Sequence, residues 1–147
     1  MVLSRAVRTS VEINAPAEKV WSVLMDWKKF PEWNPFVKSA EGEPKQGGYI
    51  KIVVQPPGKS AMSFKPLLLK VDPNKELRWE GKLMSLPGLF TGQHYYIIEE
   101  LSPGKVRFVH GEDFFGILVP LMGGSFPAVE QGFADMNAKL KELAEKP

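Results

Sequence analysis

The chain has 147 residues, of which 44% are hydrophobic and 24% are charged, a balance that is typical of a globular domain and not of a disordered segment. Its 19 basic and 17 acidic residues leave a net charge of +2, and the basic residues are scattered along the chain, which argues against nucleic acid as a partner. The absence of cysteine excludes a disulfide scaffold, a thiolate metal site and a cysteine nucleophile.

The length suits one domain with a single core, and we interpret residues 1–147 as one domain. The first ten residues include Arg5 and Arg8 but no apolar run of signal-peptide length. The sequence contains no run of 18 apolar residues, which a membrane-spanning helix would need. We therefore expect a cytoplasmic protein without a transmembrane segment. The sequence leaves the oligomeric state open.

The first part of the chain predicts one strand followed by two short helices. Residues 5–14 alternate as in a half-buried strand, and one parity consists of Val7, Thr9, Val11 and Ile13. Pro16 followed by Glu18 is typical of a first helical turn. A second short helix ends near Pro31 and Pro35, because the residue before a proline disfavours helical geometry.

The middle of the chain, from Phe36 to about Phe115, predicts strands joined by short turns. Glycine and proline mark the turns, as in Pro103-Gly104, and short connections favour an antiparallel meander. Pro66 falls inside a predicted strand and indicates an edge position or a bulge, since proline cannot donate to a neighbouring strand. The candidate strands are 36–41, 48–55, 59–71, 75–83, 92–101 and 105–115.

The last segment predicts a long amphipathic helix. Its apolar residues recur at spacings of three and four, namely Phe126, Val129, Phe133, Met136, Leu140 and Leu143. Gly123, Gly124 and Pro127 leave two alternatives for its beginning: about Ser125, or near Pro120 with a bend. Together the elements predict an α+β helix-grip fold, in which a curved antiparallel sheet of six to seven strands wraps round the C-terminal helix. One helix cannot fill such a sheet, so we expect an internal cavity.

Five segments resemble the START-like superfamily, also called SRPBCC, which includes polyketide cyclases, lipid-transfer domains and the birch-pollen allergen. The matching residues are Ala15-Pro16-Ala17-Glu18-Lys19-Val20-Trp21, Phe30-Pro31-Glu32-Trp33-Asn34-Pro35, Leu77-Arg78-Trp79-Glu80-Gly81, the segment 110–116 and the segment 132–141. The resemblance covers almost the whole chain in order and implies the helix-grip fold. It does not choose between cyclases, dehydratases, hormone receptors, lipid carriers and co-chaperone domains.

The strand 105–115 carries the residues best suited to chemistry. His110 and Glu112 share one face with Phe108 and Phe114, and this face should point inward. An imidazole and a carboxylate two residues apart suit acid–base catalysis, because burial and a neighbouring charge shift their pKa values. His110 and Glu112 are therefore the candidate catalytic residues. The alternative is that they hydrogen-bond each other in a packed interior.

The orientation of His94 depends on the turn that follows its strand. A three-residue turn at 103–105 places His94 and Tyr96 on the face of His110, whereas a turn of two or four residues directs them outward. We favour three residues, because this turn leaves a polar outer row of Gln93, Glu99 and Arg107.

Aromatic and apolar residues complete the predicted pocket. Trp79 alternates with charged neighbours and should point inward, where core packing is the alternative to ligand contact. The predicted ligand-binding residues are Trp33, Phe36, Met62, Phe64, Trp79, His94, Tyr96, Phe108, Phe114, Phe126, Val129 and Phe133. We expect the segment 84–91 to gate the pocket; the alternative is an exposed apolar patch for a protein partner.

Three functions fit these residues. The leading hypothesis is binding of a small hydrophobic or aromatic ligand, lipid- or polyketide-like, in the cavity. The alternatives are a cofactor-free cyclase or dehydratase that uses His110 and Glu112 as acid and base, and a protein-interaction module of co-chaperone type. No phosphate loop, nucleophile elbow or zinc-protease motif occurs, and a zinc site would need both histidines with Glu112. We therefore expect neither a cofactor nor a metal.

Overall fold

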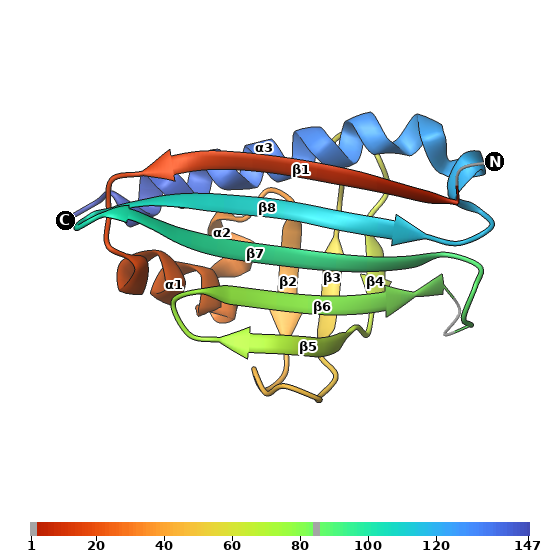
Figure 1. Ribbon diagram of the computed structural model, residues 1–147, viewed down its shortest axis with the longest axis horizontal. Helices are drawn as coiled ribbons and strands as arrows, with labels where there is room; N and C mark the ends of the chain where they lie inside the picture. The colour runs from red at the N-terminus through yellow and green to blue at the C-terminus, as the bar shows by residue number, and fades with distance from the viewer. Residues whose placement is uncertain (1–2, 84–85) are drawn as a thin grey trace.

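A computed structural model describes residues 3–83 and 86–147. The described residues form two antiparallel sheets and a long C-terminal helix (Figure 1). The strands are β1 (Ser4–Ile13), β2 (Val37–Glu41), β3 (Lys51–Val54), β4 (Met62–Phe64), β5 (Leu67–Asp72), β6 (Glu76–Lys82), β7 (Thr91–Ser102) and β8 (Lys105–Phe115). The helices are α1 (Ala17–Met25), α2 (Phe30–Trp33) and α3 (Phe126–Ala144), with 3-10 segments η1 (Trp27–Lys29) and η3 (Val119–Ser125).

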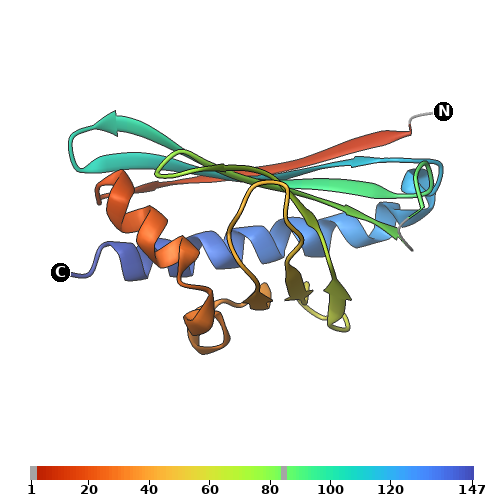
Figure 2. The ribbon, with the colours of Figure 1, turned by 90° about the horizontal axis from the view of Figure 1, so that it is seen from below.

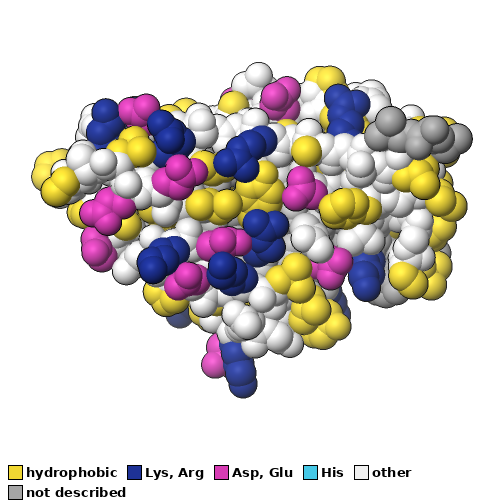
Figure 3. Space-filling view, viewed as in Figure 1, with side chains coloured by type: hydrophobic (Ala, Val, Ile, Leu, Met, Phe, Trp, Pro, Cys, Tyr) yellow, Lys and Arg dark blue, Asp and Glu magenta, His cyan; other side chains and the backbone are white. Residues whose placement is uncertain are grey.

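The large sheet has the strand order β1-β8-β7-β6-β5, and the small sheet has the order β2-β3-β4. Figure 2 shows α3 running along one face of the large sheet, with α1 and the small sheet on the same side. The other face of the large sheet carries basic and acidic side chains side by side (Figure 3). Glu99 of β7 and Arg107 of β8 form an ion pair at 3.6 Å. The predicted helix-grip fold, with two short helices after the first strand, is confirmed.

The predicted strand 59–71 is divided at Pro66 into β4 and β5, so the described residues contain eight strands and not six to seven. The Pro66 carbonyl accepts a hydrogen bond from the Ile50 amide at 3.0 Å, and Leu67 forms a bridge with Tyr49. The chain therefore passes from the small sheet to the edge of the large sheet at this proline, which has no amide hydrogen to continue a strand.

The turn between β7 and β8 differs from the prediction, although it gives the expected orientation of His94. Ser102 pairs with Lys105, so the turn has two residues, Pro103 and Gly104, and a bulge between Glu100 and Ser102 shifts the register by one. The bulge compensates for the shorter turn. His94 consequently pairs with Glu112 and lies on the inward face.

The helix α3 begins at Phe126, directly after η3, which agrees with the alternative that placed its start near Ser125. It packs against β1, β8 and α1. Its buried residues are Phe126, Gly132, Phe133, Met136, Asn137, Leu140 and Ala144, while Val129 and Leu143 are half-buried. Among the described residues, no helix has both the length and the apolar character needed to cross a membrane.

Gly132 lies where α3 passes Phe36, and it allows a close approach. A Cβ atom at Gly132 would lie 2.5 Å from Cδ1 of Phe36, whereas a Cβ atom at Gly124 would have nothing within 4 Å. The buried ring of Phe36 already packs edge to face with Phe133 at 5.2 Å, so it has little room to move.

We expect Gly132→Ala to lower the free energy of unfolding. Overpacking costs about 1–3 kcal/mol, which exceeds the gain in helix propensity of about 1 kcal/mol. Urea unfolding followed by tryptophan fluorescence measures the change, and Gly124→Ala is the control, expected to stay within about 0.5 kcal/mol of wild type. A Gly132→Ala protein as stable as wild type would show that Phe36 moves without cost.

Candidate functional site

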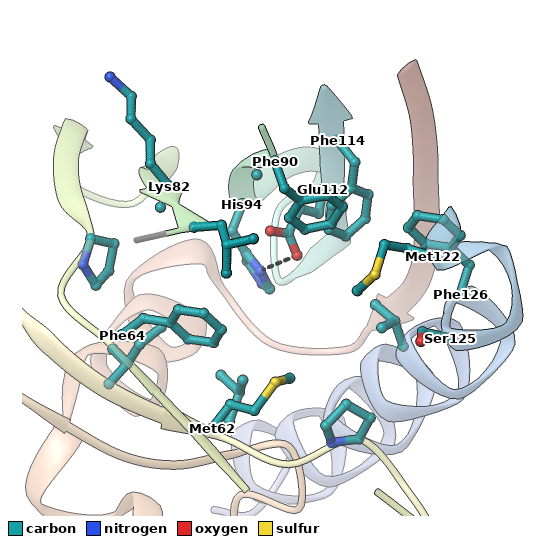
Figure 4. A pocket seen from close by; sticks show the side chains of 18 of the residues that line it. Met62, Phe64, Lys82, Phe90, His94, Glu112, Phe114, Met122, Ser125 and Phe126 are labelled. Carbon is teal, nitrogen blue, oxygen red and sulfur yellow. Dashed lines mark hydrogen bonds and ion pairs between the residues drawn. The ribbon is translucent and has the colours of Figure 1, made fainter. Parts of the chain in front are cut away.

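A cavity of about 360 Å³ lies between the inner face of the large sheet, the small sheet and the first turns of α3. Its volume is in the range of small-molecule sites, roughly 300–1,000 Å³. Figure 4 shows Glu112 and His94 near Phe90 and Phe114, with Met62 and Phe64 on the opposite side. Most of the wall is apolar, so a bound molecule would be held mainly by burial of apolar surface.

The structure divides the predicted site residues into two groups. Those in the cavity wall are Phe36, Met62, Phe64, Trp79, His94, Glu112, Phe114, Phe126 and Val129. Those outside the wall are Trp33, Tyr96, Phe108, His110 and Phe133. The middle of α3 covers the sheet, so Phe133 and the residues beneath it form packed core, and the cavity lies where α3 begins. Trp33 packs edge to face on Phe30 at the end of α2.

Several lining residues were absent from the predicted ligand-binding residues, although Phe90 belongs to the predicted gate. They are Ile52, Val54, Pro56, Lys59, Ser60, Pro66, Gly81, Lys82, Leu83, Phe90, Gly92, Leu118, Met122 and Ser125. The alternation of Ile52 and Val54 along β3 could have indicated them, whereas the residues of η3 carry no comparable signal. Within the predicted gate, Met84 and Ser85 lie outside the described residues. Phe90 faces the cavity, and the gating role remains a prediction.

Glu112 is the one acid in the described wall of the cavity, and its side chain is 17% exposed. Burial raises the pKa of its carboxyl group to about 8, and the charge of Asp113 acts in the same direction. Glu112 is consequently protonated at neutral pH. Gly92 on the adjacent strand makes room for it, because a Cβ atom there would overlap Oε2 of Glu112.

A polar chain of five side chains, Glu112, His94, His110, Asn137 and Thr9, leads from the cavity into the core. Oε1 of Glu112 is 3.2 Å from Nδ1 of His94, and Nε2 of His94 is 2.7 Å from Nε2 of His110. Nδ1 of His110 is 2.9 Å from Oδ1 of Asn137, whose Nδ2 donates to Oγ1 of Thr9 at 2.8 Å. This polar chain joins β7 and β8 to α3 and β1, and each of its five side chains has a hydrogen-bond partner.

Aromatic rings enclose both imidazoles. Trp79 stacks on His94 with 4.7 Å between ring centroids, and Phe133 stacks on His110 at 4.0 Å. Burial lowers the pKa of His94 to about 3 and the pKa of His110 well below its usual value. Both histidines are therefore neutral, and the protonated carboxyl group of Glu112 donates to Nδ1 of His94.

The contact between the two histidines distinguishes a hydrogen bond from a metal site. Two nitrogens bound to one zinc ion at about 2.0–2.1 Å lie about 3.3 Å apart in tetrahedral geometry. Nε2 of His94 and Nε2 of His110 are only 2.7 Å apart. As they lie, the two imidazoles share a proton and leave no space for a metal ion between them.

The sequence analysis missed Asn137, Thr9 and Gly92. Asn137 lies four residues after Phe133 and three before Leu140, which places an amide in the apolar stripe of the helix. Thr9 lies on the inward parity of the first strand. A polar residue in an apolar row is a signal that could have identified both, whereas the role of Gly92 depends on the register of β7 with β8.

We expect the free energy of unfolding to fall by about 1 kcal/mol between about pH 7 and pH 8 because of Glu112. In this range the folded chain retains a proton on Glu112 that the unfolded chain, with a carboxyl pKa near 4.5, has released. Stability therefore decreases as pH rises toward the folded-state pKa. The histidines contribute little here, since they are neutral in the folded chain and largely neutral in the unfolded chain.

Glu112→Gln should remove this decrease, because its amide can donate to His94 but does not titrate. Urea unfolding at a series of pH values measures the slope. Glu100→Gln, at an exposed position of β7, is the matched control and should keep the wild-type slope. Equal slopes for wild type and Glu112→Gln would contradict the raised pKa of Glu112.

Comparison with known proteins identifies the family of this chain. Residues 4–145 match the family described as polyketide cyclase / dehydrase and lipid transport. No curated protein matches the sequence. Similar solved structures include the Zhui aromatase/cyclase from Streptomyces sp. R1128, with 18% identity and a TM-score of 0.73 over 97% of this chain and 94% of that one.

Two further structures have the same fold at low identity. A START superfamily protein from Mycobacterium smegmatis is 17% identical, with a TM-score of 0.64 over 94% of this chain and 98% of that one. A truncated norcoclaurine synthase from Thalictrum flavum is 15% identical, with a TM-score of 0.67 over 98% and 95%. The family match over nearly the whole chain shows that the protein belongs to the polyketide cyclase / dehydrase and lipid transport family.

Proposed function

We propose that the protein binds one small, largely apolar molecule, lipid- or polyketide-like, in the cavity beneath the large sheet. The observation that carries the proposal is an apolar cavity of about 360 Å³ with a single carboxyl group, that of Glu112, in its described wall. Apolar side chains supply affinity through burial, and one polar group orients the molecule. The family description, which names both polyketide cyclases and lipid transport, supports the same class of ligand.

We expect the folded protein to bind the apolar fluorescent probe N-phenyl-1-naphthylamine with about one-to-one stoichiometry, since the cavity offers one apolar site for it. Val129→Trp places an indole in the cavity from α3 and should weaken binding by about tenfold or more, because it occupies the space of the probe. Fluorescence titration measures both values.

Ala134→Trp is the matched control, because Ala134 lies on the exposed face of the same helix. It should bind the probe as wild type does. Circular dichroism checks that both variants fold. Absence of binding by the wild-type protein, or equal binding by folded Val129→Trp, would refute the proposed ligand site.

A second function, cofactor-free acid–base catalysis, is favoured by the contact of Glu112 with His94. A carboxyl group with a pKa of about 8 can exchange its proton near neutral pH. The pair allows a balanced step: Oε2 of Glu112 accepts a proton from the bound molecule while the proton on Oε1 moves to Nδ1 of His94, and the reverse step returns it. In this reading His94 replaces His110 as the direct partner, because His110 does not line the cavity.

The catalytic reading predicts that the protein accelerates deuterium exchange at the methyl group of 2-acetylnaphthalene in D₂O, followed by proton NMR. Glu112→Gln cannot accept the proton and should lower the enzymatic rate by about 100-fold or more. Its binding of N-phenyl-1-naphthylamine serves as the control for an intact cavity. Equal exchange rates for wild type and Glu112→Gln would leave ligand binding as the function and exclude proton transfer by Glu112 to this probe.

A further inference from the structure

The hydrogen bonds of the polar chain have a fixed direction from donor to acceptor, which Thr9 sets at the inner end. The hydroxyl group of Thr9 lies 2.9 Å from the backbone carbonyl oxygen of His110. This carbonyl can only accept, so the single hydroxyl proton of Thr9 is used there. Oγ1 of Thr9 must then accept from Asn137, which turns the amide nitrogen of Asn137 toward Thr9 and its oxygen toward His110.

The same donor-to-acceptor direction determines the hydrogen bonds of both imidazoles. Oδ1 of Asn137 is an acceptor, so Nδ1 of His110 carries the hydrogen. A neutral imidazole carries only one, so Nε2 of His110 has a lone pair, and Nε2 of His94 must donate to it across 2.7 Å. The tautomers of both rings are therefore determined by a backbone carbonyl group at the far end of the chain.

The same direction determines what Glu112 presents to the cavity. Nδ1 of His94 and Oε1 of Glu112 hold one proton between them, on the oxygen in the neutral pair or on the nitrogen in the ion pair. A proton on Oε2 of Glu112 would leave two lone pairs facing each other at 3.2 Å, or would require a second proton and a net positive charge in an apolar site. In both favourable states, Oε2 carries no hydrogen.

Oε2 of Glu112 is also free to accept a hydrogen bond from a bound molecule. It lies against Gly92, another residue of the cavity wall, and no described residue donates a hydrogen bond to it. The cationic groups of the wall, Lys59 and Lys82, are on exposed residues at its edge. The described wall therefore offers a carboxyl oxygen that is free to accept a hydrogen bond, and its other uncharged polar side chains are His94, whose ring nitrogens are paired, and the hydroxyl groups of Ser60 and Ser125.

We infer that the ligand carries an O–H or N–H group that donates to Oε2 of Glu112, and that Thr9 and Asn137 are positioning residues that impose this requirement without touching the ligand. Neutral phenols, enols and aromatic amines meet the requirement. Ethers and ketones of the same shape do not, because they offer only lone pairs. The inference rests on the proposed binding function and adds the chemical class of the ligand.

Four naphthalenes test the inference at about pH 6.5, where 2-naphthol is neutral. Displacement of N-phenyl-1-naphthylamine gives the dissociation constants of naphthalene, 2-naphthol, 2-methoxynaphthalene and 2-acetylnaphthalene. We expect 2-naphthol to bind about 3- to 10-fold more tightly than 2-methoxynaphthalene, as one hydrogen bond to a partly buried acceptor allows. The advantage should disappear in Glu112→Leu and persist in the exposed control Glu100→Leu.

The outcomes separate the two proposals. If naphthalene binds and 2-naphthol has no advantage, or if 2-acetylnaphthalene binds best, the cavity function stands and the donor requirement is wrong. If the probe binds and none of the four compounds displaces it, the inferred ligand class is wrong; if the probe itself does not bind, the proposed binding function fails.

Nitrogen NMR of the imidazoles tests the positioning role separately, and the chain has only two histidines to assign. His110 should show the Nδ1–H tautomer, and His94 should carry a hydrogen on Nε2. Thr9→Val keeps the shape but removes the acceptor for Asn137, so we expect mixed tautomers and a smaller advantage of 2-naphthol. Ser10→Ala, at the exposed neighbouring position, should change neither. A hydrogen on Nε2 of His110 in the wild-type protein would overturn the assigned direction.

Discussion

The packing of α3 across one side of the large sheet is the constraint on which the site depends. The middle of the helix, around Phe133 and Met136, fills the space over β8 and β1 and excludes water. Nearer its beginning, Gly132 lies against Phe36 and sets how closely the helix approaches the segment before β2. The cavity is the volume that remains, so its position follows from how the helix crosses the sheet and not from any single residue of its wall.

This packing also explains why a polar chain can exist inside the protein. Two neutral imidazoles, an amide and a hydroxyl group would each be costly to bury alone. Placed in a row they satisfy one another, and the aromatic faces of Trp79 and Phe133 exclude water from the imidazoles. Glu112 and His94 reach the cavity, but both ring nitrogens of His94 are paired within the row. The carboxyl group of Glu112 thus lies at an apolar surface, and the other polar groups of the row each have a hydrogen-bond partner.

The sequence was sufficient for the order of the elements and for the inward faces of the strands, because alternation along a strand and the spacing of apolar residues in a helix are local properties. Trp79, Glu112 and Val129 were assigned to the cavity wall on that basis, and they lie there. The extent of the cavity was not predictable. Tyr96 and Phe108 share an inward face with the wall residues, yet α3 covers them, and the place where a helix crosses a sheet is set by contacts distant in sequence.

The role of His110 shows the same limit. Its parity gave the correct face, but only the pairing of His94 with Glu112 and of Tyr96 with His110 reveals which imidazole touches the carboxyl group. That register depends on a two-residue turn and a bulge. The alternation of residues along the sequence predicts the strand but does not indicate the bulge. Asn137 and Thr9 lie 128 positions apart in the sequence, so their contact was beyond any local argument.

The pairing of β1 with β8 has a consequence for synthesis on the ribosome. β1 is made first, yet its neighbour in the sheet is β8, and Thr9 meets its amide partner only when α3 has formed. Contacts of such long sequence separation slow folding, because the intervening chain must be ordered before they form. Until β8 has been made, the edge of β1 that pairs with it therefore has no partner in the sheet. The charged residues Arg8 and Glu12, which alternate with the inward row of that strand, are suited to protect this edge from premature association with other chains.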